Sequence, residues 1–179
     1  MTKADFDGEE LLALARLDIE QNRLDRALSK IKQGLALGDY PIELCALGAK
    51  VYAQLKIFAK AKQLYSQYLE VHPDSLTDQF QLGMVTFDSG DKGGALALWQ
   101  ELLQAHPTHP PALYYSSIAL FETRKVDEAK RNIDVLLKSA PASNLYFERG
   151  KELLAHINKG EGGPENRSLP AGFAYHSEN

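Results

Sequence analysis

His106 and His109 have a spacing that resembles that of metal ligands, because imidazoles a few residues apart often bind the same ion. They flank Pro107, however, and neither a cysteine nor a cluster of acids accompanies them. His72 precedes Pro73 just as His106 precedes Pro107. We therefore attribute the histidine at this position to a sequence repeat and not to metal binding. We therefore expect a solvated turn and no metal site.

Nucleophilic and phosphate-binding chemistry find little support either. Cys45 is the only cysteine and falls at an inward position of a predicted helix, which favours an inert buried thiol. The glycine-containing stretch 90–94 does not follow a strand, as a phosphate-binding loop would. No Ser/His/Asp set or paired carboxylates can be argued for. We expect no catalytic residues and no cofactor.

The composition narrows the range of partners. Of the 179 residues, 44% are hydrophobic, which suffices for a buried core. The net charge of −4 favours no basic surface for phosphates, so we expect no nucleic-acid partner. No apolar run approaches the ~18 residues of a membrane span, and the acidic N-terminal residues lack a signal-peptide pattern. A cytoplasmic protein without membrane insertion is the expectation.

Residues of the same kind recur along the chain at one constant spacing, and this spacing predicts the helices that must position any binding site. The even spacing is carried by Ala27, Ala61, Ala95 and Ala129, by the large residues Ile31, Tyr65, Trp99 and Ile133, and by Pro73, Pro107 and Pro141. Such a period predicts two antiparallel helices per repeat, with small residues that let the helix axes approach closely. Proline then ends the second helix of each repeat.

On these residues the chain resembles the tetratricopeptide-repeat (TPR) family, whose repeat has the same length. The third repeat fits the family pattern best, through Leu82, Gly83, Ala95, Trp99 and Pro107. The first repeat is the most degenerate and has Asp39 in place of the proline. The resemblance covers roughly residues 8–142. It implies an all-α fold, a right-handed α-solenoid of four helix–turn–helix repeats with a C-terminal capping helix.

The period predicts the domain organisation. Helices are expected over 8–21, 24–37, 41–54, 58–71, 75–88, 92–105, 110–122 and 126–139, in repeats near 8–41, 42–75, 76–109 and 110–142. A capping helix over 143–158 would complete a TPR domain of residues 8–159, with Ser143 as its N-cap. Its residues Phe147, Leu154 and Ile157 would face the last repeat. We expect residues 1–7 to be frayed and 160–179 to be a flexible tail.

A binding groove is expected along one stripe of the first helix of each repeat. The stripe takes positions spaced i, i+4 and i+7, and its candidate binding residues are Arg16, Lys50, Phe80, Met84, Phe87, Tyr114, Ile118 and Phe121. The apolar half would hold an apolar or aromatic peptide, because exposed apolar patches mark interaction sites. Arg16 and Lys50 would meet acidic groups or a terminal carboxylate. In the alternative interpretation, the rings are buried against the next helix of the stack.

The apolar segment 169–175 suggests a further hypothesis, that the C-terminal tail occupies the groove as a self-inhibitor. A plain solvated tail is the alternative interpretation.

The sequence favours a non-catalytic adaptor or assembly factor that binds a protein or peptide. Two narrower hypotheses follow from the resemblance: a TPR-class secretion chaperone, or an accessory factor of cytochrome c maturation or pilus assembly. A self-associating scaffold, and hence a homo-oligomer, is a further alternative. An enzyme on a TPR scaffold is disfavoured because a fold does not supply chemistry.

Overall fold

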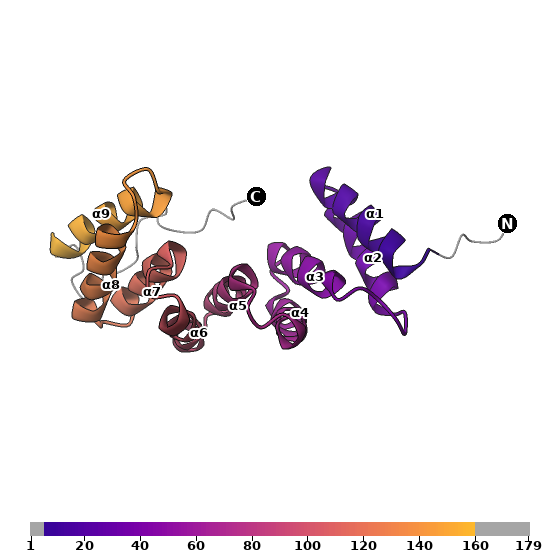
Figure 1. Ribbon diagram of the computed structural model, residues 1–179, viewed down its shortest axis with the longest axis horizontal. Coiled ribbons are helices and arrows are strands. Elements are labelled where there is room, and N and C mark those ends of the chain that lie inside the picture. The colour runs from indigo at the N-terminus through magenta and orange to yellow at the C-terminus, as the bar shows by residue number, and fades with distance from the viewer. Residues whose placement is uncertain (1–5, 160–179) are drawn as a thin grey trace. The chain divides into compact units, whose positions relative to one another are not determined.

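The computed structural model describes residues 6–159. In this range the chain forms nine α-helices and no strand, which confirms the expected all-α fold (Figure 1). The helices are α1 (Gly8–Glu20), α2 (Leu24–Leu35), α3 (Glu43–Gln54), α4 (Phe58–Val71), α5 (Leu76–Asp88), α6 (Lys92–Ala105), α7 (Pro110–Glu122), α8 (Val126–Ser139) and α9 (Leu145–Asn158). The expected tail, with its apolar segment 169–175, lies outside the described residues.

The helix ends follow from local chemistry. The residues before the three periodic prolines, His72, His106 and Ala140, have left the helical conformation, with ψ values of 65°, 74° and 138°. The fraying expected up to residue 7 is wrong at Asp7. Its carboxylate accepts a hydrogen bond from the Glu10 backbone at 2.9 Å, and Glu10 accepts one from the Asp7 backbone at 3.0 Å. This capping box fixes the start of α1.

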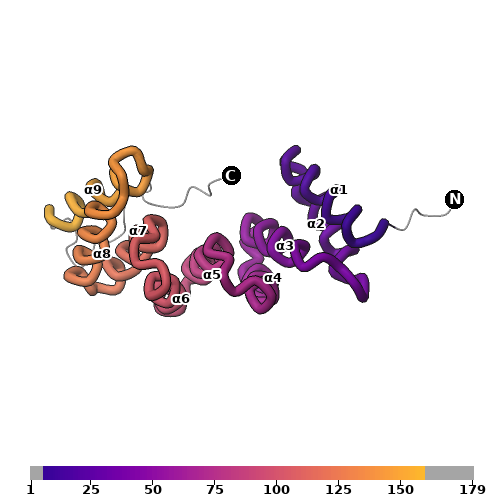
Figure 2. Tube along the Cα trace, viewed as in Figure 1, coloured from indigo at the N-terminus to yellow at the C-terminus, as the bar shows by residue number. Residues whose placement is uncertain are grey.

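The described helices form two compact units that divide between Gly90 and Asp91, inside the predicted third repeat. The N-terminal unit holds α1–α5 and the C-terminal unit holds α6–α9. Within each unit the chain runs back and forth between neighbouring helices (Figure 2). In the N-terminal unit α1 packs on α2 and α3 on α4, and in the C-terminal unit α7 packs on α8 and α9.

The periodic residues lie where the helices of a unit meet. All four periodic alanines are fully buried, and the large residues that follow them are at most 3% exposed. Opposite them, Ala15, Ala49 and Ser117 are also fully buried. Small side chains at this crossing let the two axes come close, as the period predicts. The interior of each repeat is therefore built from residues that the sequence marks.

The turns within the helix pairs share an unpredicted feature. Asn22, Lys56, Gly90 and Arg124 have φ values of 55°, 58°, 91° and 66°, and they are evenly spaced, one in each repeat. This left-handed conformation favours glycine, since a Cβ crowds the following carbonyl oxygen. Three of the four turns therefore hold a side chain in a strained conformation.

Glycine at the strained turns should stabilise the protein. We expect Lys56→Gly and Arg124→Gly to raise the unfolding free energy by up to about 1 kcal/mol, because relief of strain exceeds the entropy that glycine adds to the unfolded chain. Gly90→Ala should lower it by about 1 kcal/mol. Urea unfolding followed by circular dichroism measures these changes. Thr123→Gly, at a φ of −92°, is the control and should destabilise; equal effects at 123 and 124 would contradict the assignment of strain.

The capping helix differs from its prediction at two points. Asn144, not Ser143, is the N-cap, and its side-chain oxygen accepts a hydrogen bond from the Tyr146 backbone at 2.9 Å. The buried face of α9 consists of Tyr146, Gly150, Leu153 and Ile157. Phe147 and Leu154 are only half-buried, so of the three residues expected on this face Ile157 alone is right.

Candidate functional site

The apolar stripe of α7 is not a free surface. Tyr114, Ile118 and Phe121 are only 1%, 3% and 7% exposed. Helix α9 covers them: the Tyr114 ring lies 5.6 Å from that of Tyr146, and the Phe121 ring lies 5.7 Å from that of His156. Their predicted exposure is therefore wrong, and burial against the next helix, the alternative interpretation, describes this part of the stripe.

The same positions of α5 are largely closed as well. Met84 is 2% exposed and Phe80 9%, whereas Phe87 is half-buried. A side chain this deeply buried has little area left to contact a peptide. Phe80 and Met84 thus contribute to the interior, which corrects their predicted exposure.

The basic half of the stripe is exposed. Arg16 on α1 and Lys50 on α3 both lie open to solvent, one repeat apart at equivalent positions of two helices that contact each other. No salt bridge or hydrogen bond is formed by either side chain among the described residues. On α3, Ala46 and Ala53 flank Lys50 at i−4 and i+3 and are half-buried. Both cations are therefore exposed, and small side chains flank Lys50.

The structure places the residues that we considered for metal binding or thiol chemistry. No group of three or more His, Cys, Asp or Glu side chains lies close enough to hold a metal within residues 6–159. Cys45 is fully buried in the hydrophobic core of the N-terminal unit. Burial raises the pKa of its thiol, which disfavours the reactive thiolate.

His109 is the N-cap of α7, a role that its spacing did not suggest. Its Nδ1 accepts a hydrogen bond from the Ala112 backbone at 3.2 Å. Pro110 follows His109 directly, at the first helical position, where proline is favoured. Only a neutral imidazole can accept this bond. Burial, with a smaller contribution from the nearby charge of His106, lowers the pKa of His109 from 6.5.

This lowered pKa predicts a pH dependence of stability. The unfolded chain takes up a proton at His109 before the folded chain does, so stability is complete above pH 6.5 and decreases as the pH falls toward the folded pKa. His109→Asn keeps a good N-cap without a titrating group. We expect the melting temperature of the wild type to fall more than that of the variant between pH 7 and 5, as measured by thermal unfolding. Parallel curves would contradict the assignment.

Asp18 is a buried carboxylate that the sequence analysis missed. Its side chain is 4% exposed and pairs with Arg23, at 2.7 Å, and with Lys30. The hydrogen bond from Lys30, assisted by Arg23, holds the pKa of Asp18 below its usual value, although burial acts in the opposite direction. Both cations come from the turn and helix that follow α1, so this ion pair joins α1 to α2 and has a structural role.

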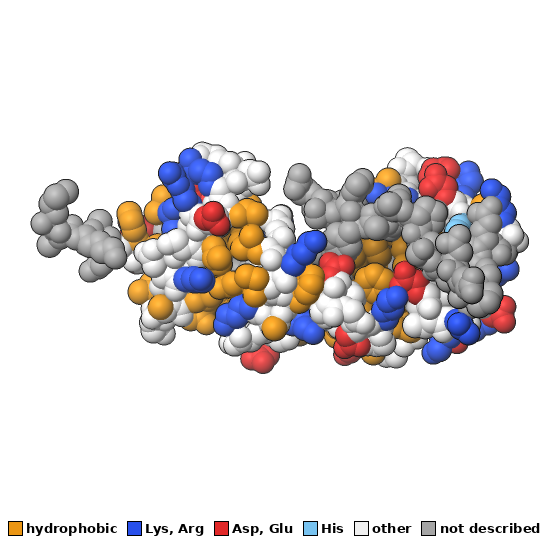
Figure 3. Space-filling view, turned by 180° about the vertical axis from the view of Figure 1, so that it is seen from behind, with side chains coloured by type: hydrophobic (Ala, Val, Ile, Leu, Met, Phe, Trp, Pro, Cys, Tyr) orange, Lys and Arg blue, Asp and Glu red, His pale blue; other side chains and the backbone are white. Residues whose placement is uncertain are grey.

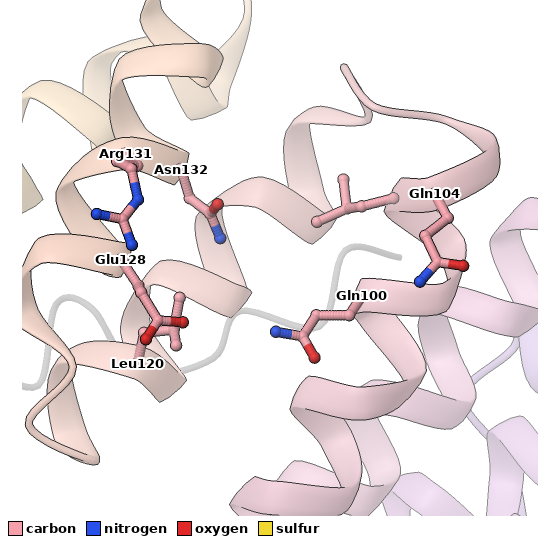
Figure 4. A pocket seen from close by; sticks show the side chains of 7 residues that line it. Gln100, Gln104, Leu120, Glu128, Arg131 and Asn132 are labelled. Atoms are coloured by element: carbon pink, nitrogen blue, oxygen red, sulfur yellow. The ribbon is translucent and has the colours of Figure 1, made fainter.

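An open depression of ≈ 400 Å³ lies between α6 and α8 in the C-terminal unit (Figure 4). Its lining residues are Gln100, Leu103, Gln104, Leu120, Glu128, Arg131 and Asn132. In Figure 4 Gln100 extends from α6 toward α8, and Asn132 extends from α8 toward α6. The sequence gives one local sign of this site, the exposed amides four residues apart on α6, but the opposite wall comes from another repeat.

The surface is mixed in character. On the face seen in Figure 3, hydrophobic side chains gather in patches that lysine, arginine and acidic side chains border. A polar rim around apolar area is typical of protein interfaces. In the part of the chain that the structure describes, no helix has both the length and the hydrophobicity that crossing a membrane requires.

The sequence comparisons identify one repeat directly. A family model described as "Tetratricopeptide repeat" matches residues 48–75. These residues run from the middle of α3 to the start of the next turn, across the second predicted repeat. No curated protein sequence matches the chain.

Solved structures resemble the chain over most of its length. MamA from AMB-1 has a TM-score of 0.69 and 17% identity, over 75% of this chain and 79% of that one. A tetratricopeptide repeat protein from Parabacteroides merdae has a TM-score of 0.73 and 17% identity, over 85% and 60%. YrrB, described as a TPR protein with an unusual peptide-binding site, has a TM-score of 0.67 and 19% identity, over 90% and 81%. At such low identity these similarities concern the fold.

Proposed function

Because the chain is a tetratricopeptide-repeat protein, we propose that it is a non-catalytic adaptor that binds a segment of a partner protein. The observation that carries the proposal is a pair of cations, Arg16 and Lys50, at equivalent positions of α1 and α3. Both are exposed and form no salt bridge or hydrogen bond with another described residue. YrrB, which has the same fold, is described as having a peptide-binding site, which adds support. Of the originally predicted groove, Arg16, Lys50 and the half-buried Phe87 remain part of the proposal.

The chemistry of this surface defines the segment. Neighbouring helix axes lie about 8–10 Å apart, so the two cations can reach acidic groups a few residues apart on one extended peptide. The alanines beside Lys50 leave room for the peptide backbone. We propose that the N-terminal unit binds an acidic segment or a chain-terminal carboxylate.

Affinity capture from the native host, followed by calorimetry with peptides of the captured partner, tests this function. We expect Arg16→Glu combined with Lys50→Glu to weaken binding at least about tenfold, because each cation would be replaced by a repelling charge. Binding to the wild type should also weaken with added salt.

Arg26→Glu combined with Lys32→Glu is the matched control. Both residues are exposed on α2, and the variant has the same net charge as the test variant. Equal losses of affinity in the two variants would exclude the α1–α3 surface. Self-association without a partner, measured by sedimentation, would instead favour a homo-oligomeric scaffold. The identity of the captured partner also distinguishes between the secretion-chaperone, cytochrome c maturation and pilus-assembly alternatives. The cytoplasmic location stays a prediction.

A further inference from the structure

We infer that the depression between α6 and α8 is a second binding site, which takes an extended peptide segment with an apolar side chain and, two residues away, a carboxylate. It lies in the C-terminal unit and is lined mainly by second helices of the repeats, with Leu120 of α7, so it shares no residue with the α1–α3 surface.

The two polar walls match the main chain of an extended peptide. Gln100 and Gln104 form one wall, and a primary amide both donates and accepts hydrogen bonds, as a peptide unit does. Four residues of helix advance about 6 Å, and two residues of an extended chain advance about 6.6 Å. Every second peptide unit of an extended chain faces the same way. Two such units can therefore bond to Gln100 and Gln104, one to each. Asn132 offers a third amide from the α8 wall (Figure 4).

The floor of the depression suits an apolar side chain. Leu103 of α6 is half-buried and presents apolar surface between the polar walls, whereas Leu120 of α7, at 2% exposed, adds little to it. An extended peptide points alternate side chains to the same side. When its main chain bonds to the glutamines, one side chain can reach Leu103, and the side chain two residues away faces the protein again.

The charges of α8 favour a carboxylate at that second position. Arg131 is exposed and Glu128, one turn earlier, is half-buried, and both line the depression. Neither forms a salt bridge or a hydrogen bond within residues 6–159, and the same holds for the three amides. A guanidinium binds a carboxylate through two parallel hydrogen bonds. Glu128 repels an acid at its own end, which favours placing the carboxylate beside Arg131.

Nuclear magnetic resonance provides a direct test on the full chain. The probe is a blocked pentapeptide, Ser-Leu-Ser-Asp-Ser, titrated into isotope-labelled protein to millimolar concentration. We expect the side-chain amide signals of Gln100, Gln104 and Asn132 to shift together and to saturate with one dissociation constant. Shifts that are absent, or that scatter over other helices, overturn the inference.

Two variants locate the contacts. Gln100→Leu combined with Gln104→Leu should raise the dissociation constant at least about tenfold, because two hydrogen bonds are lost. Gln63→Leu, the same change at an exposed position of α4, is the control and should leave it unchanged. An unchanged constant in the double variant, with native circular dichroism, overturns the proposed main-chain contacts.

The contact between the peptide carboxylate and Arg131 is tested by changing each of the two groups in turn. The wild type should bind the Asp peptide several-fold more tightly than its Asn analogue, and Arg131→Gln should abolish this preference. Preference retained in Arg131→Gln excludes the proposed charge contact. If the same amide signals shift with protein concentration in the absence of peptide, the occupant is a second copy of this chain and the inference of a partner peptide is wrong.

Discussion

Replacing Ile133 with alanine is expected to lower the unfolding free energy by about 2–5 kcal/mol, a large part of the stability of a small domain. Ile133 has no exposed surface and follows the buried Ala129 by one helical turn in α8. The alanine would leave a cavity between helices that cannot close fully. Trp99, the only tryptophan, is itself buried in the C-terminal unit and reports its unfolding by fluorescence.

Urea titration of the tryptophan signal measures this loss, as a lower midpoint with an unchanged slope. Val135→Ala is the control, because Val135 is on the same helix but is 39% exposed. Its effect should stay within about 0.5 kcal/mol, the range of most surface substitutions. The same midpoint for both variants would show that the periodic positions of α8 do not dominate its packing.

A second large effect is expected at the contact between α9 and α8. A Cβ on Gly150 would lie 2.9 Å from Cδ2 of Leu136, which is fully buried. Gly150→Leu should therefore lower the unfolding free energy by about 1–3 kcal/mol through overpacking. It should also displace α9 and expose Tyr114 and Phe121 of α7.

Exposure of these rings should raise the fluorescence of an added hydrophobic dye and increase hydrogen exchange in α7. Ala155→Leu adds a side chain on the exposed face of the same helix and is the control. If dye binding is the same in both variants, α9 is not what covers the apolar stripe of α7.

This second prediction bears on how a peptide could be bound. In the folded chain the apolar stripe of α7 is occupied by Tyr146 and His156 of α9. The two surfaces proposed for binding are mainly polar or charged: the cations on α1 and α3, and the amides between α6 and α8. Recognition by hydrogen bonds and charge pairs contributes to specificity, because a wrong segment leaves polar groups unpaired.

Local chemistry made most of the fold predictable. The alanines that recur once in every repeat predict where two helices cross, and all four are fully buried. Prolines predict where helices end, and α4, α6 and α8 stop two residues before them. Where this information is weak, the bounds shift: α2, whose repeat has Asp39 in place of the periodic proline, ends at Leu35 instead of residue 37. The capping helix begins two residues late, since Asn144 competes with Ser143 as N-cap.

What faces solvent depends on tertiary contacts. Sequence period places Arg16 and Tyr114 on the same stripe, yet the first is exposed and the second is 1% exposed. The difference arises because α9 packs on α7, and the period of a helix does not say which neighbour lies against it. The depression likewise joins Gln100 to Asn132, which only the packing of separate helices brings together. Helix positions and crossing points are thus encoded locally, whereas the binding surfaces are decided by the contacts between helices.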